Sequence, residues 1–279
     1  MSTSVTNEQS FEWQIEKALV GSTREERGAG ADVAAQSPEA DRFFWGKPSD
    51  MDKALAIDTR RLWSFLKATQ SDRLEAYRGQ APLDENVPQQ IAAQIKQFGI
   101  LEVLRKGVDV DNIKLDLWYP RPGAGDSAAA WEDFAKNEFS VTRQQTFSLS
   151  HPGDELDMVV FVNGLPLFTF ELKNPWTGQT ARYNGQKQYR EDRDPRDPLL
   201  NFGRCLAHFT LDKDEVFFTT RLAGKKTAFM PFNKGLPDGQ GAGNPDNPNG
   251  FKTSYLWERV LTKATIADII QNYALFDYG

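Results

Sequence analysis

Two apolar segments joined by Asn163-Gly164 constrain the fold of this chain more than any other feature. Residues 156–162 and 165–173 consist mainly of Met, Val, Phe and Leu, and each has the length of a buried strand. An Asn-Gly pair between two such segments is a strong signal for a β-hairpin. We therefore expect two antiparallel strands in the interior of the protein.

Three charged residues interrupt this apolar hairpin: Asp157, Glu171 and Lys173. An ionised side chain on a buried strand is costly unless it is paired or binds a metal. Glu171 and Lys173 share one face, because side chains alternate along a strand. Carboxylate oxygens suit Mg²⁺, which accepts phosphate oxygens and activates water, and a lysine can position or deprotonate that water. The residue types therefore predict phosphodiester hydrolysis.

The turn between the strands decides whether Asp157 joins this face. A two-residue loop, Asn163-Gly164, sends Asp157 to the opposite face from Glu171. A three-residue loop, 162–164 with the glycine in a G1 bulge, shifts the pairing by one residue and puts both carboxylates on one face. We predict the bulged loop or another loop of odd length.

The remaining segments predict helices around a sheet. Apolar residues at helical spacing indicate helices, alternating residues indicate strands, and residues 21–41 have the composition of a mobile loop. We expect helices over 7–20, much of 50–98, 181–190 and 255–273, and further strands over 114–119, 139–148 and 215–221.

These elements predict an α/β fold with a central mixed β-sheet flanked by helices and a helical N-terminal region. We divide the chain into three parts. Residues 1–130 form an N-terminal helix, a mobile loop and a helical region packed on the core, residues 131–235 form the core, and residues 236–279 form a loop and a C-terminal helical segment.

Charge and cysteine content exclude several classes of protein. With 33 basic and 39 acidic residues the net charge is −6, which argues against a general nucleic-acid-coating role. A single cysteine, Cys205, cannot form an internal disulfide, and residues 1–8 lack the regions of a signal peptide, so we expect a cytoplasmic protein. No apolar run approaches the roughly 20 residues of a membrane span, so no membrane association is expected.

Asp157, thirteen intervening residues and Glu171-Leu-Lys173 resemble the Asp…Glu-x-Lys motif of the PD-(D/E)XK nuclease superfamily. Wider phrases resemble the N-terminal endonuclease region of the restriction (R) subunit of type I restriction-modification enzymes, over most of residues 55–265. These phrases are Phe161-Val-Asn-Gly-Leu-Pro166, Phe170-Glu-Leu-Lys-Asn-Pro175, Thr177-Gly-Gln-Thr180, Gln188-Tyr-Arg190, Asp192-Arg-Asp-Pro-Arg-Asp197, Thr219-Thr-Arg-Leu-Ala-Gly224, Met230-Pro-Phe-Asn-Lys-Gly235 and Ser254-Tyr-Leu-Trp257.

The resemblance implies a Mg²⁺-dependent endonuclease, with Mn²⁺ as a possible substitute for Mg²⁺. Asp157 and Glu171 are the implied metal ligands, and Lys173 is the implied catalytic lysine. An acidic residue on the first helix, Glu16 or Glu12, could be a further ligand, against the alternative of a solvent-facing side chain.

The family also carries a Gln-x-x-x-Tyr element on the helix that follows the motif. Tyr189 fits the tyrosine, but Gly185 stands four residues before it, and Gln186 and Gln188 are the nearby glutamines. We take Gln186 and Tyr189 as candidate site residues, with an ordinary exposed helix face as the open alternative.

The family's subunit also contains an ATP-driven DNA translocase, whose phosphate-binding loop requires Gly-x4-Gly-Lys-Ser/Thr. Neither Gly224-Lys-Lys-Thr227 nor Gly250-Phe-Lys-Thr253 has that spacing, so this chain resembles the front part of a larger subunit. The resemblance implies double-stranded DNA as substrate, and the methyltransferase and specificity subunits as partners. The open alternative is a non-catalytic docking module that joins the motor to the methyltransferase core.

Overall fold

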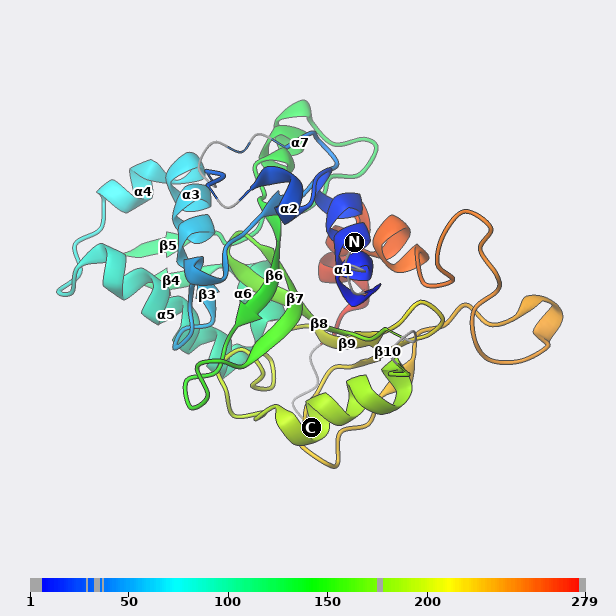
Figure 1. The fold of residues 1–279 in the computed structure, drawn as a ribbon. Helices are drawn as coiled ribbons and strands as arrows, with labels where there is room; N and C mark the ends of the chain where they lie inside the picture. Colours follow the sequence, from blue (N-terminus) through cyan, green and yellow to red (C-terminus); the bar gives the residue numbers. More distant parts are fainter. Residues whose placement is uncertain (1–6, 29, 33–35, 37, 175–177, 276–279) are drawn as a thin grey trace.

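A seven-stranded mixed sheet forms the centre of the protein, in the order β1-β6-β7-β8-β9-β10-β11 (Figure 1). The structure is a computed structural model that describes residues 7–28, 30–32, 36, 38–174 and 178–275, with the side chains of 7–10 and 238 left out. The strands are β1 (Phe44–Trp45), β6 (Phe139–Thr146), β7 (Glu155–Val162), β8 (Leu165–Leu172), β9 (Ala207–Leu211), β10 (Val216–Thr219) and β11 (Met230–Pro231). The β1–β6 and β8–β9 pairs are parallel and the others antiparallel, which confirms the predicted α/β fold with a mixed sheet.

Helices cover both faces of this sheet. In the N-terminal half they are α1 (Asn7–Val20), α2 (Arg24–Arg27), η1 (Pro48–Asp50), α3 (Thr59–Thr69), α4 (Ser71–Glu75), α5 (Leu83–Phe98), α6 (Ile100–Lys106) and α7 (Ala128–Ala135). In the C-terminal half they are η3 (Ala181–Gly185), η4 (Gln188–Asp192), η5 (Pro237–Gly239), η6 (Leu256–Val260), α8 (Lys263–Asp268) and η7 (Ile269–Tyr273). None of the described helices is long and apolar enough to cross a membrane.

Most of the expected elements are confirmed, with three differences. The segment 114–119 contributes only β5 (Ile113–Leu115), which pairs with β4 (Val108–Val110) outside the main sheet, as β2 (Met51–Asp52) pairs with β3 (Ile57–Asp58). The segment 21–41, expected to be a loop, contains α2, which begins with a capping box between Thr23 and Glu26. Strand β9 was not anticipated from the sequence.

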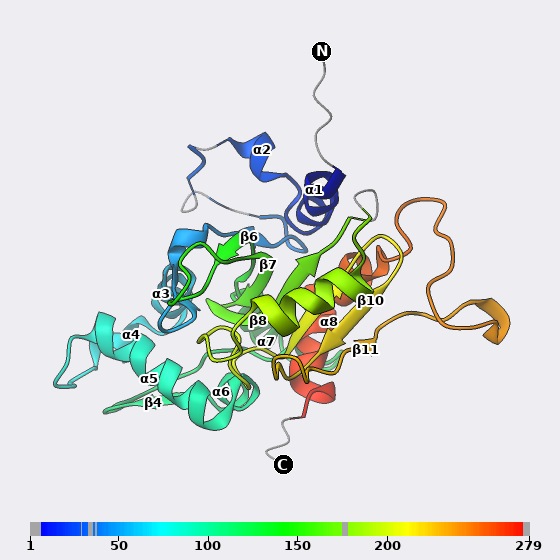
Figure 2. The same cartoon turned by 60° about the horizontal axis from the view of Figure 1, so that its bottom comes forward.

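Each face of the sheet has its own apolar core, and β7 contributes to both. Val160 and Val162 pack on the face covered by α1, α5, α6 and α8, while Val159 and Phe161 pack on the face that carries Tyr189 of η4. Figure 2 shows the helix of η3 and η4 (yellow-green) across one face of the sheet and α8 with η7 (red) behind it.

The turn of the β7–β8 hairpin differs from the prediction. Val162 pairs with Leu165, so the loop has two residues, and the predicted loop of odd length is wrong. Both Asn163 and Gly164 have positive φ, as a type I′ turn requires. A side chain at Gly164 would come within 2.3 Å of the carbonyl oxygen of Asp58, so packing holds the turn tight.

A β-bulge at Leu167 puts Glu171 on the face of Asp157, which the two-residue turn alone would prevent. Phe161 pairs with Pro166 but Val160 pairs with Phe168, so Leu167 is an extra residue on β8. Leu167 and Phe168 both belong to the core that also contains Val160. Beyond the bulge, the pairing of β8 with β7 is shifted by one residue, so each β8 side chain points to the opposite face from the one that the turn alone would give it. Glu171 therefore lies on the same face as Asp157.

Candidate active site

Asp157 of β7 and Glu171 of β8 lie opposite each other, one position beyond the Met158–Phe170 pair. Asp157 Oδ2 accepts a hydrogen bond of 2.5 Å from the backbone N–H of Leu172. The Nζ atom of Lys173 lies 4.0 Å from Asp157 Oδ2 and 3.9 Å from Glu171 Oε2. The structure therefore brings together the three residues of the predicted motif.

The three side chains differ in their access to solvent. Glu171 is fully buried, the Lys173 side chain is 7% exposed, and that of Asp157 is 24% exposed. A ligand that approaches the site from solvent therefore meets Asp157 first, with Glu171 beneath it.

Burial raises the pKa of both carboxyl groups. The pKa of Glu171 rises to about 8, because the group is buried and the charge of Asp157 lies beside it, although Arg193 and Lys173 oppose this shift. Burial also raises the pKa of Asp157, against the attraction of Lys173. The pair therefore resists carrying two negative charges until further positive charge arrives.

The donor set fits a divalent cation that keeps most of its water. Glu171 Oε2 is buried and has no hydrogen-bond partner within the described part of the chain. Among the described residues no three His, Cys, Asp or Glu side chains are grouped to hold a metal by themselves. Two carboxylates remain as protein ligands, and Mg²⁺ is commonly bound by one or two carboxylates together with water and substrate phosphate oxygens.

Arg193 is a site residue that the sequence did not reveal. Its Nε atom donates to Glu171 Oε1 over 2.8 Å, and its Nη2 atom donates to the carbonyl oxygen of Glu155 over 2.7 Å. It belongs to a basic cluster that follows the motif along the chain: Arg182, Lys187, Arg190, Arg193 and Arg196. The sequence holds one signal for this contact: Arg193 directly follows η4, and the helix that follows the motif packs over β8.

Other members of that basic cluster have partners on the surface. Arg182 pairs with Glu215 at 2.7 Å, Lys187 with Glu191 at 3.8 Å, and Arg196 with Asp194 at 2.7 Å. In these three pairs the acidic partners offset the positive charge of the cluster, and surface pairs of this kind contribute little to stability.

Tyr189 of η4 is hydrogen-bonded to strand β8. Its hydroxyl group hydrogen-bonds to Thr169 Oγ1 over 2.8 Å, and Thr169 Oγ1 also contacts His208 Nδ1 at 2.7 Å. Tyr189 is fully buried, so the alternative of an exposed helix face is wrong for it. Burial raises the pKa of Tyr189 well above 10 and lowers that of His208 to about 3, so both groups are neutral near pH 7.

The glutamine of the expected Gln-x-x-x-Tyr element has no room at the matching position. A Cβ atom on Gly185 would lie 1.7 Å from Thr210 Oγ1 and 3.4 Å from Lys173 Cγ. Gln186 is 7% exposed, and no hydrogen bond in the described part of the chain joins it to Asp157 or Glu171. Gly185 thus lets the helix approach Lys173 closely.

The two acidic candidates on α1 belong to a different cluster. Arg143 donates to Glu16 Oε2 and to Glu12 Oε2, each at 2.9 Å, and Arg27 pairs with Glu16 Oε1 at 2.5 Å. Arg143 lies opposite Met158, whose side chain points to the other face of the sheet from Asp157. The structure therefore does not bring Glu16 or Glu12 to the carboxylate pair.

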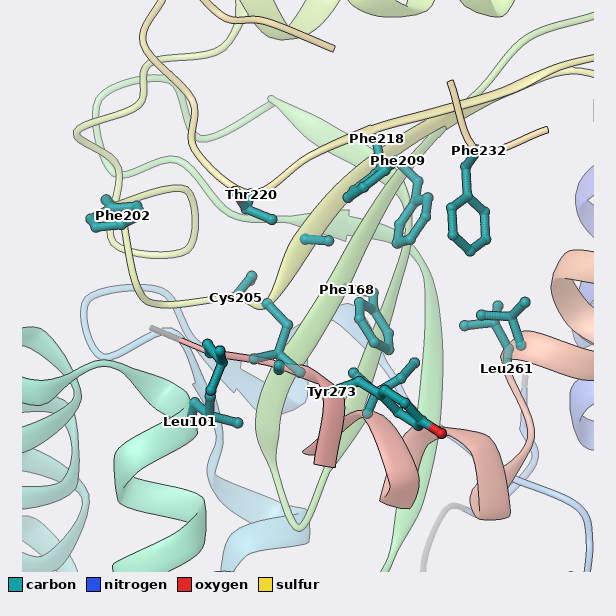
Figure 3. A pocket seen from close by; sticks show the side chains of 16 residues that line it. Leu101, Phe168, Phe202, Cys205, Phe209, Phe218, Thr220, Phe232, Leu261 and Tyr273 are labelled. Atoms are coloured by element: carbon teal, nitrogen blue, oxygen red, sulfur yellow. The ribbon is translucent and has the colours of Figure 1, made fainter. Parts of the chain in front are cut away.

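An apolar cavity of about 430 Å³ lies on the face of the sheet opposite Asp157 and Glu171, between the sheet and the C-terminal helices (Figure 3). Phe168, Phe209 and Tyr273 line it together with Cys205, whose thiol pKa is raised to about 12 by burial. Cys205 is a buried free cysteine. The cavity shares no lining residue with the carboxylate pair.

Comparison with known proteins agrees with the resemblance in the motifs. A family model described as the type I restriction enzyme R protein N terminus matches residues 60–227, which is 168 of 279 residues. The matched region contains Asp157, Glu171, Lys173, Tyr189 and Arg193. No curated protein matches the chain.

Proposed function

Because the chain belongs to the family of type I restriction enzyme R protein N termini, we propose that it is the Mg²⁺-dependent endonuclease part of such a subunit. Its reaction is the hydrolysis of phosphodiester bonds in double-stranded DNA. Asp157 and Glu171 bind the metal, and Lys173 is the catalytic lysine.

The observation that carries this proposal is the open geometry of the charged cluster. The buried ion pairs of Arg143 are closed at 2.9 Å, whereas Lys173, also buried, stays 3.9 and 4.0 Å from the two carboxylates. Glu171 Oε2 is at the same time buried without a hydrogen-bond partner among the described residues. A buried polar atom is rarely left in that state in a purely structural role.

Each side chain then has a separate task. Bound Mg²⁺ supplies activation of water and neutralises charge on the phosphate. Asp157, the more exposed carboxylate, faces the incoming strand, and Arg193 holds Glu171 in place from the opposite side. Lys173 adds positive charge to the attacked phosphate and orients or deprotonates the water.

The remaining parts of a restriction complex come from other polypeptide segments. We propose that the choice of DNA site belongs to a specificity subunit acting with the methyltransferase subunit, and that an ATP-driven motor delivers the DNA. The acidic net charge of this chain suits a nuclease that receives DNA from a motor and does not bind it tightly alone. We place this activity in the cytoplasm.

The first test is nicking of supercoiled plasmid with Mg²⁺ or Mn²⁺ by the chain and by its Asp157→Ala and Lys173→Ala variants. Lys136→Ala is the matched control, because Lys136 pairs with Asp133 on the surface and away from the motif. We expect metal-dependent nicking by the unaltered chain and the control, and its loss in both site variants.

The assembled restriction complex supplies the second test. There Lys173→Ala should abolish DNA cleavage and leave the ATPase intact. A complex that carries Lys173→Ala and still cuts at the normal rate would contradict the nuclease proposal and favour the docking module.

A further inference from the structure

Arg204 is a buried arginine without a counter-ion in the described part of the chain. Its exposed fraction is 7%, and its Nη2 atom donates to the carbonyl oxygen of Ala92 in α5 over 3.2 Å. Its Nη1 atom is buried and has no acceptor within the described residues. No carboxylate oxygen of the described chain lies within 4.0 Å of its guanidinium group.

This arrangement is unusual, because a buried charge is expected to be paired. The other two buried arginines of the described chain obey that rule: Arg61 pairs with Glu138 at 3.1 Å and Arg143 with Glu16 at 2.9 Å. The positive charge of Arg204 therefore has no negatively charged partner among the described residues around it.

The side chain of Arg204 lines a pocket of about 310 Å³ between α5 and residues 196–204. Two more cations line it, Lys96 of α5 and Arg196, together with the amide side chains of Gln89 and Asn201. No acidic residue is among the lining residues. Arg196 is already paired with Asp194, so Lys96 and Arg204 supply most of the uncompensated charge.

We propose that this pocket binds a phosphate group, with Arg204 as its anchor and Lys96 at its rim. A guanidinium group offers several N–H donors in a fixed plane that matches two phosphate oxygens, and the amides of Gln89 and Asn201 can donate to the others. The phosphate supplies the negative charge that Arg204 lacks.

The place of the pocket suggests where such a phosphate comes from. Arg196 lies three residues after Arg193, which contacts Glu171, so one short segment connects the pocket to the carboxylate pair. A phosphodiester of the DNA strand is one source, and that assignment rests on the proposed nuclease function. Free phosphate or a small phosphorylated molecule is the other source and does not depend on it.

The test uses the thermal midpoint of the whole chain with inorganic phosphate, against chloride at equal ionic strength, in EDTA. We expect phosphate to raise the midpoint of the unaltered chain and of the Lys136→Ala control. The increase should be absent in Arg204→Met, and Lys96→Ala should bind phosphate at least tenfold more weakly. Without phosphate, Arg204→Met should be at least as stable as the unaltered chain, because it removes an unpaired buried charge.

A second measurement separates the two sources. Binding of a short duplex oligonucleotide, also in EDTA, should weaken in Arg204→Met and Lys96→Ala more than in Lys136→Ala if the phosphate belongs to DNA. A phosphate response with equal duplex binding by all variants identifies the free phosphate source.

The proposal is overturned if Lys96→Ala and Lys136→Ala bind inorganic phosphate equally well and also bind the duplex oligonucleotide equally well. This comparison remains decisive even if Arg204→Met fails to fold. Because these measurements exclude divalent metal, their failure leaves the nuclease proposal at Asp157 and Glu171 untouched.

Discussion

Arg193 Nε donates a hydrogen bond to Glu171 Oε1 over 2.8 Å, and this contact connects the segment after η4 to strand β8. Glu171 is fully buried, and the Arg193 side chain is 9% exposed. A hydrogen-bonded ion pair in such surroundings interacts more strongly than one in water. Arg193 therefore fixes one oxygen of Glu171 and leaves Oε2 for another partner.

A double-mutant cycle measures this pairing. Arg193→Gln leaves the ionised Glu171 without its partner and should destabilise the metal-free protein by about 1 to 3 kcal/mol in urea unfolding at about pH 9, above the Glu171 pKa of about 8. In a Glu171→Gln background the same substitution should cost clearly less, because the charge to be satisfied is gone. Additive effects of the two substitutions would show that the contact contributes nothing in solution.

The raised pKa of Glu171 predicts how stability changes with pH. The folded pKa is about 8 and the ordinary value is 4.5, so the native state binds the proton more tightly than the unfolded state. The contribution of the protonated group to stability is fully present below pH 4.5 and is lost as the pH rises through 8, a loss on the order of 5 kcal/mol.

Urea unfolding in EDTA from pH 5 to 9 tests this dependence. Glu171→Gln, a mimic of the protonated carboxyl group, should flatten much of the decline between these values. Because the pKa of His208 is lowered from 6.5 to about 3, its contribution to stability increases with pH, and only below pH 6.5. The decline in stability above pH 6.5 therefore reports on the carboxyl pair and not on His208. An equally steep decline in Glu171→Gln would disprove the assignment.

Metal binding should release protons from the same group. At pH 7 the Glu171 carboxyl group is largely protonated, whereas a metal ligand must be ionised. We expect Mn²⁺ titration calorimetry at pH 7, in buffers of different ionisation enthalpy, to report release of close to one proton, and the affinity to rise between pH 6 and 8. Asp157→Ala should abolish the signal. Binding without proton release would contradict the buried carboxyl group as a ligand.

Gly185 should not tolerate a side chain. Since a Cβ atom there would lie 1.7 Å from Thr210 Oγ1 and 2.9 Å from Thr210 Cβ, Gly185→Ala must push the helix away from β9 and Lys173. We expect a loss of more than about 1 kcal/mol in unfolding free energy and weaker nuclease activity. Gly153→Ala is the matched control, because its Cβ would meet no atom within 4 Å. Equal stability of the two variants would refute the close approach.

Local patterns determined the elements that carry the chemistry. The strands around Asn163-Gly164 were predictable because alternation and turn preference are properties of neighbouring residues. The cost of charge on such strands singled out Asp157, Glu171 and Lys173, which lie together in the structure. The fold class followed from the order of these elements and was confirmed by the sheet.

Contacts between distant segments decided what the sequence left open. The faces of Asp157 and Glu171 depend on the bulge at Leu167, because Gly164 packs against Asp58 and Leu62 and keeps the turn at two residues. The pairing of β9 with β8 is parallel, and that of Arg193 with Glu171 spans a helix, so no local pattern encodes either. The sequence by itself determined which residue types and strands are available for the chemistry. Tertiary packing decided which of them face one another, because register and burial are set by segments far apart along the chain.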